Sequence, residues 1–130
     1  MNQAYHDDIR ELYLKVCESL PGISSVVKAQ MYKAGYCALD EPYAAWFEKL
    51  TAINNQMMSK FDDRSELVMT QLSHLYEHMS INGKTFLETY FIEGLFYGVG
   101  VAACKHYWGL LPNNLKSKYI AVHGQPPIHS

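Results

Sequence analysis

Apolar residues recur at spacings of three and four along most of the chain, which is the pattern of amphipathic helices. The first stripe predicts a helix over about residues 5–19, and later stripes predict helices over about 25–34, 42–61 and 64–79. A shorter stripe predicts a last helix over about 114–122. No segment alternates with a period of two for long enough to indicate a β-strand. The pattern therefore predicts an all-α protein.

Residues with known capping or breaking preferences stand at the ends of these stripes. Asp40 is the predicted cap of the third helix, and Asp62 or Asp63 is the predicted cap of the fourth. Asn82-Gly83 is expected to break the fourth helix, and Gly124 is expected to stop the last one.

A long apolar segment follows the fourth stripe. Thr85 with Glu88 fits the spacing of a capping box, and the segment from there to Ala102 is apolar on nearly all sides. Such a pattern predicts a buried central helix. Gly94, Gly98 and Ala102 recur every four residues, about one helical turn apart, so close packing or a kink is expected within this helix.

These elements predict a single compact bundle of five or six helices. The length of 130 residues fits one domain. Residues 1–124 are expected to form that helical domain, and residues 125–130, which include Pro126-Pro127, are expected to be an extended C-terminal tail.

The start of the chain does not have the pattern of a secretory signal. Its first nine residues carry Asp7 and Asp8 and no apolar core. Both acids suit the first turn of the first helix, where the helix dipole favours anions, and Pro21-Gly22 is expected to stop that helix. We therefore expect a cytoplasmic protein.

Composition excludes several classes of protein. Hydrophobic residues make up 48% and charged residues 18%, which argues against disorder, and the net charge of −2 argues against a strongly basic nucleic-acid binder. Three cysteines without close spacing do not indicate a disulfide framework. The longest uncharged apolar stretch, residues 94–104, is shorter than the ~20 residues that span a bilayer. We expect no nucleic-acid partner, no membrane span and no cofactor.

The string from His74 to His78 matches H-x-x-E-H, in which two histidines hold zinc and Glu77 serves as general base. Only three positions of this motif are fixed, and a zinc site needs a third ligand. On a helix, His78 falls at the edge of the apolar stripe and His74 lies farther toward solvent. Two surface histidines are thus the main interpretation, and a zinc-dependent hydrolase using His74 and His78 is an alternative.

Glu93 lies between apolar neighbours, so its burial is expected. A buried carboxylate must be paired or hydrogen-bonded. It can serve as a general acid or as a structural partner of a tyrosine hydroxyl, a lysine or a helix N-terminus. No partner base is evident in the sequence.

Acidic and aromatic residues supply candidates for protein recognition. All thirteen acidic residues lie within the first hundred positions, and a core of this size cannot bury every tyrosine and tryptophan. Exposed aromatic side chains anchor interfaces, and acidic groups steer basic partners. The predicted partner-binding residues are Asp40, Glu41, Glu48, Asp62, Asp63, Glu66, Tyr43 and Tyr76. Tyr36, Trp46, Tyr97, Tyr107, Trp108 and Tyr119 belong to the same wider aromatic set.

The C-terminal third carries a recognisable order of residues: Glu93–Tyr97 (EGLFY), Trp108–Pro112 (WGLLP), then Tyr119, Gly124 and Pro126. This order resembles that of small all-helical bacterial immunity proteins, such as those of contact-dependent growth inhibition systems. The resemblance implies a cytoplasmic inhibitor that binds and blocks one secreted toxin, often a nuclease, inside the producing cell.

The leading interpretation is therefore a non-enzymatic inhibitor that covers the active surface of a cognate toxin domain. Two other hypotheses stay open. One is the zinc-dependent hydrolase described above, and the other is a homodimeric helical module that associates through exposed aromatic side chains.

Overall fold

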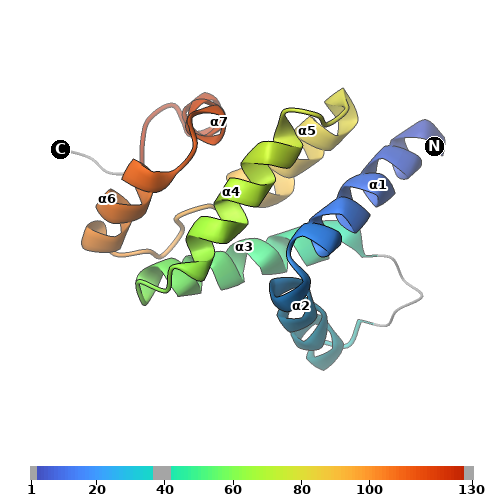
Figure 1. Cartoon of the computed structure of the whole chain (residues 1–130), viewed down its shortest axis with the longest axis horizontal. Helices are drawn as coiled ribbons and strands as arrows, with labels where there is room; N and C mark the ends of the chain where they lie inside the picture. Colours follow the sequence, from blue (N-terminus) through green and yellow to red (C-terminus); the bar gives the residue numbers. More distant parts are fainter. Residues whose placement is uncertain (1–2, 37–41, 128–130) are drawn as a thin grey trace.

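The computed structural model describes residues 3–36 and 42–127. This part of the chain consists of helices and connecting turns without a β-strand (Figure 1). The elements are α1 (Gln3–Ser19), α2 (Pro21–Lys33), α3 (Tyr43–Ser59), α4 (Arg64–Tyr76), α5 (Ile81–Leu87), the π-helix η2 (Glu88–Ile92), α6 (Val101–Leu110) and α7 (Asn113–His123). The all-α class is confirmed, and the described residues form seven α-helices rather than five or six.

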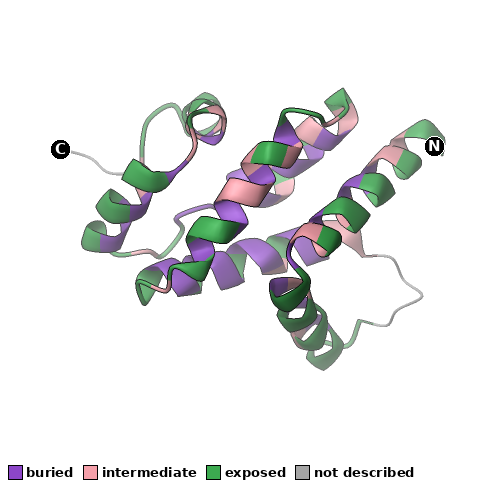
Figure 2. Cartoon of the chain, in the orientation of Figure 1, coloured by how far each residue is buried: buried purple, intermediate pink, exposed green. Residues whose placement is uncertain are grey.

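The central helix of the molecule is α3. It contacts α1, α2, α4, α6 and η2, and much of its surface is buried (Figure 2). Phe47, Leu50 and Met58 on α3 are fully buried. Along the long axis, α1 and α2 lie at one end and α6 and α7 at the other (Figure 1). One hydrophobic core runs between these ends, with α3 through its middle.

The predicted long helix after the fourth stripe is wrong, because the structure divides it. α5 ends at Leu87, and η2 follows with a hydrogen bond from the Glu93 N–H to the Glu88 carbonyl at 3.0 Å. This five-residue step defines a π-helix, whereas an α-helix uses a step of four. Residues 93–100 then form tight turns before α6 begins.

Two residues of these turns have a left-handed backbone. Phe96 has φ +71° and Gly98 has φ +74°. Glycine adopts this conformation without strain, whereas a phenylalanine there needs support from its surroundings. Both left-handed residues lie in the turns after η2, so the segment does not continue as a helix through Gly98.

α5 begins before the predicted capping box. Ser80 is its cap, because the Ser80 Oγ accepts a hydrogen bond from the Gly83 N–H at 3.1 Å. Asn82-Gly83, the predicted break, lies in the first turn of α5. Thr85 lies exposed inside the helix and does not start it.

The first two helices also differ from expectation at their ends. α1 begins at Gln3, so Asp7 and Asp8 lie beyond its first turn. Pro21 is the first residue of α2, where its missing N–H is harmless. The break between α1 and α2 is thus the single residue Leu20 rather than Pro21-Gly22.

The end of the last helix agrees with the sequence. Gly124 has φ +82° and caps α7, as its position predicts. Residues 125–127 follow outside any helix, and the rest of the predicted tail lies outside the described residues, as does the predicted cap Asp40. Of the helices in the described ranges, none combines the length and apolar character that crossing a bilayer requires.

Candidate functional site

A groove lies where α3 faces η2 and the turns that follow it. Its volume is about 500 Å³. It is lined by Glu48, Thr51, Ala52, Asn55, Thr89, Tyr90, Glu93, Gly94 and Tyr97. We call these nine residues the acidic groove. One wall is α3, and the other is the segment where the predicted long helix breaks.

Asn55 on α3 holds the broken segment in place. Its Nδ2 donates to the Gly94 carbonyl at 2.9 Å, and its Oδ1 accepts from the Phe96 N–H at 2.9 Å. Both bonds cross from α3 to the turns, and Asn55 itself is buried. The Asn55 side chain therefore holds both Phe96, which has a left-handed backbone, and Gly94, two positions earlier.

Thr51 makes the second contact between α3 and this segment. Its Oγ1 donates to the Phe47 carbonyl at 2.9 Å and lies 3.3 Å from the Tyr90 carbonyl and 3.4 Å from the Phe91 carbonyl. A Cβ added to Gly94 would lie 3.3 Å from the Thr51 Cγ2, which is close contact. Gly94 thus lets η2 and the following turn approach α3.

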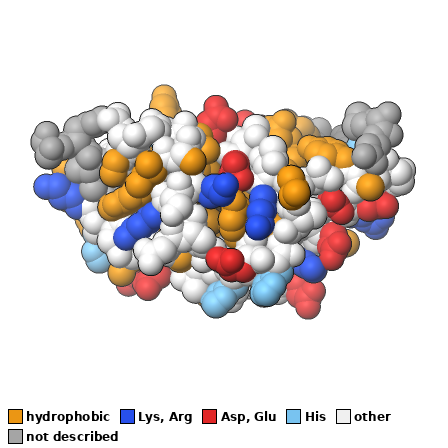
Figure 3. Space-filling view, turned by 90° about the horizontal axis from the view of Figure 1, so that it is seen from above, with side chains coloured by type: hydrophobic (Ala, Val, Ile, Leu, Met, Phe, Trp, Pro, Cys, Tyr) orange, Lys and Arg blue, Asp and Glu red, His pale blue; other side chains and the backbone are white. Residues whose placement is uncertain are grey.

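The walls of the acidic groove carry one sign of charge. Glu48 and Glu93 are exposed, and no hydrogen bond or ion pair between described residues engages either carboxylate. The described lining includes no lysine, arginine or histidine. Tyr97 is 85% exposed beside them. The face shown in Figure 3 intersperses acidic, basic and hydrophobic side chains.

The backbone around the groove departs from regular structure. A π-helix and a non-glycine residue with positive φ lie within nine residues of each other. Such features are costly, and they cluster at functional sites in proteins. This clustering is a second reason, independent of charge, to place the candidate site here.

Glu93 is exposed, so its predicted burial is wrong. A continuous α-helix would place Glu93 among apolar neighbours on a buried element. The extra residue in η2 changes the direction of the side chains that follow, so Glu93 faces the groove. Its carboxylate therefore remains in water.

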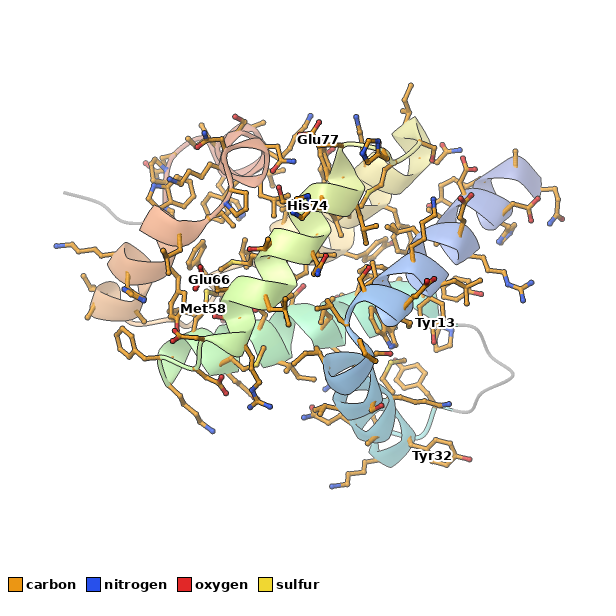
Figure 4. All side chains as sticks on the ribbon, viewed as in Figure 1. Tyr13, Tyr32, Met58, Glu66, His74 and Glu77 are labelled. Carbon is orange, nitrogen blue, oxygen red and sulfur yellow. The ribbon has the colours of Figure 1, made fainter. Side chains whose placement is uncertain are left out.

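The other predicted acidic group lies at the α3–α4 connection. Asp62 accepts hydrogen bonds from the Arg64 side chain, with Nη2 2.6 Å from Oδ2, and these bonds hold the pKa of its carboxyl below its usual range. Asp63 occupies the cap position of α4 and accepts from the Tyr107 hydroxyl at 3.4 Å, whereas Glu66 is exposed near the start of α4 (Figure 4). Arg64 engages Asp62 and the Tyr107 hydroxyl engages Asp63, so this group keeps only the Glu66 carboxylate without a partner among the described residues, whereas both carboxylates of the acidic groove are unengaged.

Of three further predicted contact residues, the structure describes only Tyr43. Asp40 and Glu41 lie outside the described residues. Tyr43 is half-buried, with its ring centroid 4.9 Å from that of Tyr13.

Tyr76 needs a correction, because the structure buries it. Only 5% of Tyr76 is exposed, and its hydroxyl donates to the Glu88 Oε2 at 3.2 Å. Burial, together with the nearby Glu88 carboxylate, raises the pKa of Tyr76 to about 12. Tyr76 supports the core between α4 and η2 and is not part of an exposed recognition surface.

The wider aromatic set is also divided. Trp46, Tyr107 and Tyr119 are buried, whereas Tyr36 and Tyr97 are exposed. Burial is the main cause of the raised pKa values of Tyr107 and Tyr119. Most of these rings therefore build the core, and of this set Tyr97 lines the acidic groove.

The histidine pair does not share a helix as the zinc hypothesis assumed. His74 lies in the last turn of α4, which ends at Tyr76, so His78 lies in the turn that follows (Figure 4). Glu77 accepts a hydrogen bond from the Asn114 Nδ2 at 2.9 Å. Across the described ranges, no group of three or more His, Cys, Asp or Glu side chains could hold a metal ion.

Sequence reasoning missed Thr51, Asn55 and Tyr90 as groove residues. Asn55 stands in a run between Ile53 and Met57, both on the predicted inner face of the third helix. At ~100° per residue, Asn55 lies about 160° around the helix from both of them, away from the predicted inner face, so the apolar stripe gave no signal for its burial. The partners of its amide depend on the break, which the periodicity hides.

Comparison with known proteins adds no name to this site. No known protein family, no curated protein and no solved structure matches the chain. The functional argument therefore rests on the geometry of the acidic groove and on the resemblance noted from the C-terminal third.

Proposed function

We propose that this protein is a non-enzymatic inhibitor that binds a cognate toxin domain, as bacterial immunity proteins do, in the cytoplasm of the producing cell. The acidic groove is the proposed contact surface. The observation that carries the proposal is the pairing of two unengaged carboxylates, Glu48 and Glu93, with the exposed ring of Tyr97 on a braced helical scaffold.

Charge complementarity favours a basic partner surface. Proteins that act on nucleic acids present basic side chains to phosphates. The two carboxylates of the groove match such a surface, and opposite charges raise the rate of association. Screening by salt would weaken this steering, so association is expected to slow as ionic strength rises.

Tyr97 supplies the apolar part of the proposed contact. Tyrosine is common among the residues that dominate interface energies, because its ring buries a large area with few rotatable bonds. The segment that carries Tyr97 is held by the two Asn55 bonds, so little order has to be gained on binding.

Co-expression with the product of the adjacent open reading frame tests the proposal. We expect the two proteins to co-purify and the toxin to lose its activity. Tyr97→Ala and Glu93→Lys are each expected to weaken binding at least roughly tenfold. Glu18→Lys makes the same charge reversal at an exposed position of α1, far along the chain from the groove. It is expected to change the affinity for the partner by no more than about twofold.

Glu66→Lys separates the acidic groove from the α3–α4 connection. If Glu66→Lys abolishes binding and Glu93→Lys does not, the contact surface has been placed wrongly. If the neighbouring product neither binds the protein nor is inhibited by it, the immunity hypothesis itself fails.

A further inference from the structure

A second hollow lies at the opposite side of α3, where α1, α2 and the start of α3 meet. Its volume is about 260 Å³. It is lined by Arg10, Tyr13, Leu14, Lys28, Met31, Tyr32, Tyr36, Pro42, Tyr43 and Trp46. Figure 4 shows Tyr13 from α1 and Tyr32 from α2 on the same side of this end of the molecule. We call it the aromatic pocket, and it shares no residue with the acidic groove.

The walls of the aromatic pocket are aromatic rings in mutual contact. The Tyr13 ring lies 4.9 Å from the Tyr43 ring and 5.1 Å from the Trp46 ring, the latter edge-on. Tyr32 is 67% exposed at the rim. Flat rings at these spacings offer faces and edges against which another planar ring can pack.

A buried donor without an acceptor belongs to the same pocket. Trp46 is 4% exposed, and its Nε1–H has no hydrogen-bond partner among the described residues. Buried N–H groups in folded proteins are almost always paired. Tyr13 adds a second donor, because burial raises the pKa of its hydroxyl to about 12 and keeps it protonated. Two residues that line the pocket therefore carry donors suited to an acceptor group.

Both charged residues in the described lining of the pocket are cations. They are Arg10 and Lys28, and no ion pair or hydrogen bond to a described residue engages either one. No carboxylate occurs among the described lining residues. On the neighbouring surface, in contrast, Lys15 pairs with Glu11 at 2.9 Å. The described lining of the pocket is thus cationic and includes no counter-charge.

We propose that the aromatic pocket binds a small planar aromatic carboxylate of one or two rings. The ring packs against the tyrosine and tryptophan walls, and the carboxylate faces Arg10 and Lys28. An arginine fork can hold a carboxylate through two parallel hydrogen bonds. Ligand pockets are commonly apolar with a few polar groups that fix orientation, and the modest volume limits the ligand to one or two rings.

Binding of 2-naphthoate tests this assignment, with neutral 2-naphthamide as the matched ligand. The chain has two tryptophans, so Trp108→Phe leaves the Trp46 indole N–H as a single signal in a ¹H–¹⁵N spectrum. We expect 2-naphthoate to shift that signal saturably and to bind about tenfold more tightly than the amide. Far-ultraviolet circular dichroism of each variant verifies that it is folded.

Substitutions of the cations complete the test. Arg10→Gln is expected to weaken 2-naphthoate about tenfold while leaving 2-naphthamide unchanged. Lys105→Gln removes an exposed lysine of α6 and is expected to change neither ligand. A missing or unsaturable shift, equal binding of acid and amide, or equal losses from Arg10→Gln and Lys105→Gln would each overturn the assignment.

Discussion

Two adjacent asparagines of α3 lead to opposite expectations for the same substitution. Asn54 and Asn55 are both buried. Asn55 makes the two bonds to the Gly94 carbonyl and the Phe96 N–H, whereas neither amide atom of Asn54 has a hydrogen-bond partner among the described residues. Leucine has nearly the shape of asparagine and no polar atoms, so Asn→Leu at each position isolates the hydrogen bonding.

The magnitudes follow from what each amide satisfies. Asn55→Leu leaves a buried N–H at Phe96 and a part-buried carbonyl at Gly94 without partners. Each orphaned group costs about 1–3 kcal/mol, so the expected loss of stability is about 2–6 kcal/mol. Asn54→Leu removes an amide that is desolvated without compensation, so it is expected to stabilise the fold by about 1–2 kcal/mol.

Urea denaturation of the two variants and the parent protein measures the difference. The two changes differ by about 3–8 kcal/mol, which separates the two midpoints by roughly 1.5–4 M urea at an m-value of about 2 kcal/mol/M. Hydrogen exchange supplies a second readout, because Asn55→Leu should expose the Phe96 N–H while Asn54→Leu should not. If Asn54→Leu destabilises the protein as much as Asn55→Leu does, the Asn54 amide is satisfied in solution and the reasoning is refuted.

Three further outcomes are expected from local structure. Ser80→Ala removes the cap of α5 and should destabilise by about 1 kcal/mol in urea, whereas Thr85→Ala, inside the same helix, should be neutral or slightly stabilising; equal losses would contradict the assigned helix start. Gly124→Ala places a Cβ at φ +82° and should cost about 1–2 kcal/mol in thermal unfolding, whereas Gly22→Ala in the open first turn of α2 should gain about 0.5 kcal/mol; a gain at both positions would rule out the left-handed cap. Because the pKa of Tyr76 in the folded protein is raised to about 12, its contribution to stability is full below about pH 10 and is lost as the pH rises from 10 to 12. Tyr76→Phe should therefore reduce the loss of stability that a series of urea melts measures between pH 10 and 12. An unchanged dependence of stability on pH would refute the assignment.

The amphipathic helices could be predicted from the sequence because their signal is local. The buried residues of α1 and α4 include Ile9, Leu12, Val68 and Leu72, which belong to the apolar stripes seen in the sequence. Apolar periodicity reports which side of a helix is buried, and it does so wherever the helix is continuous. The same holds for Gly124, whose conformational freedom makes it a helix stop whatever surrounds it.

The break after α5 could not be read from the same signal. Residues on both sides of it are apolar, so a continuous buried helix and a broken buried segment give similar patterns. What decides between them is tertiary structure: Asn55 and Thr51 on α3 supply hydrogen bonds to the segment, and Gly94 allows the close approach. These partners lie some forty positions away in the sequence, beyond any local window.

The residues of the candidate site also differ in how well the sequence predicted them. Glu48 was found from sequence as an exposed acid on an amphipathic helix, and it does line the acidic groove. Glu93 was noticed for the wrong reason, because its exposure depends on η2. Tyr76 was chosen as an exposed ring, yet its hydroxyl bond to Glu88 belongs to the core. Local chemistry was therefore readable, whereas the direction of each side chain was not.

The break in the helix and the acidic groove have one physical origin. Had the segment after Leu87 continued as an α-helix, Glu93 would lie on a buried element, and the chain would have to desolvate its carboxylate. The π-helix instead turns Glu93 to solvent, and the turns that follow bring Tyr97 beside it. Asn55, which also lines the groove, accepts a hydrogen bond from the Phe96 N–H and so supports the left-handed backbone of Phe96. Asn55→Leu should therefore weaken partner binding as well as the fold, whereas Ser80→Ala should lower stability and leave binding intact. If both variants lose binding in proportion to their loss of stability, Asn55 has no specific effect on the groove. The structural reason for placing the partner contact at the break in the helix would then be removed.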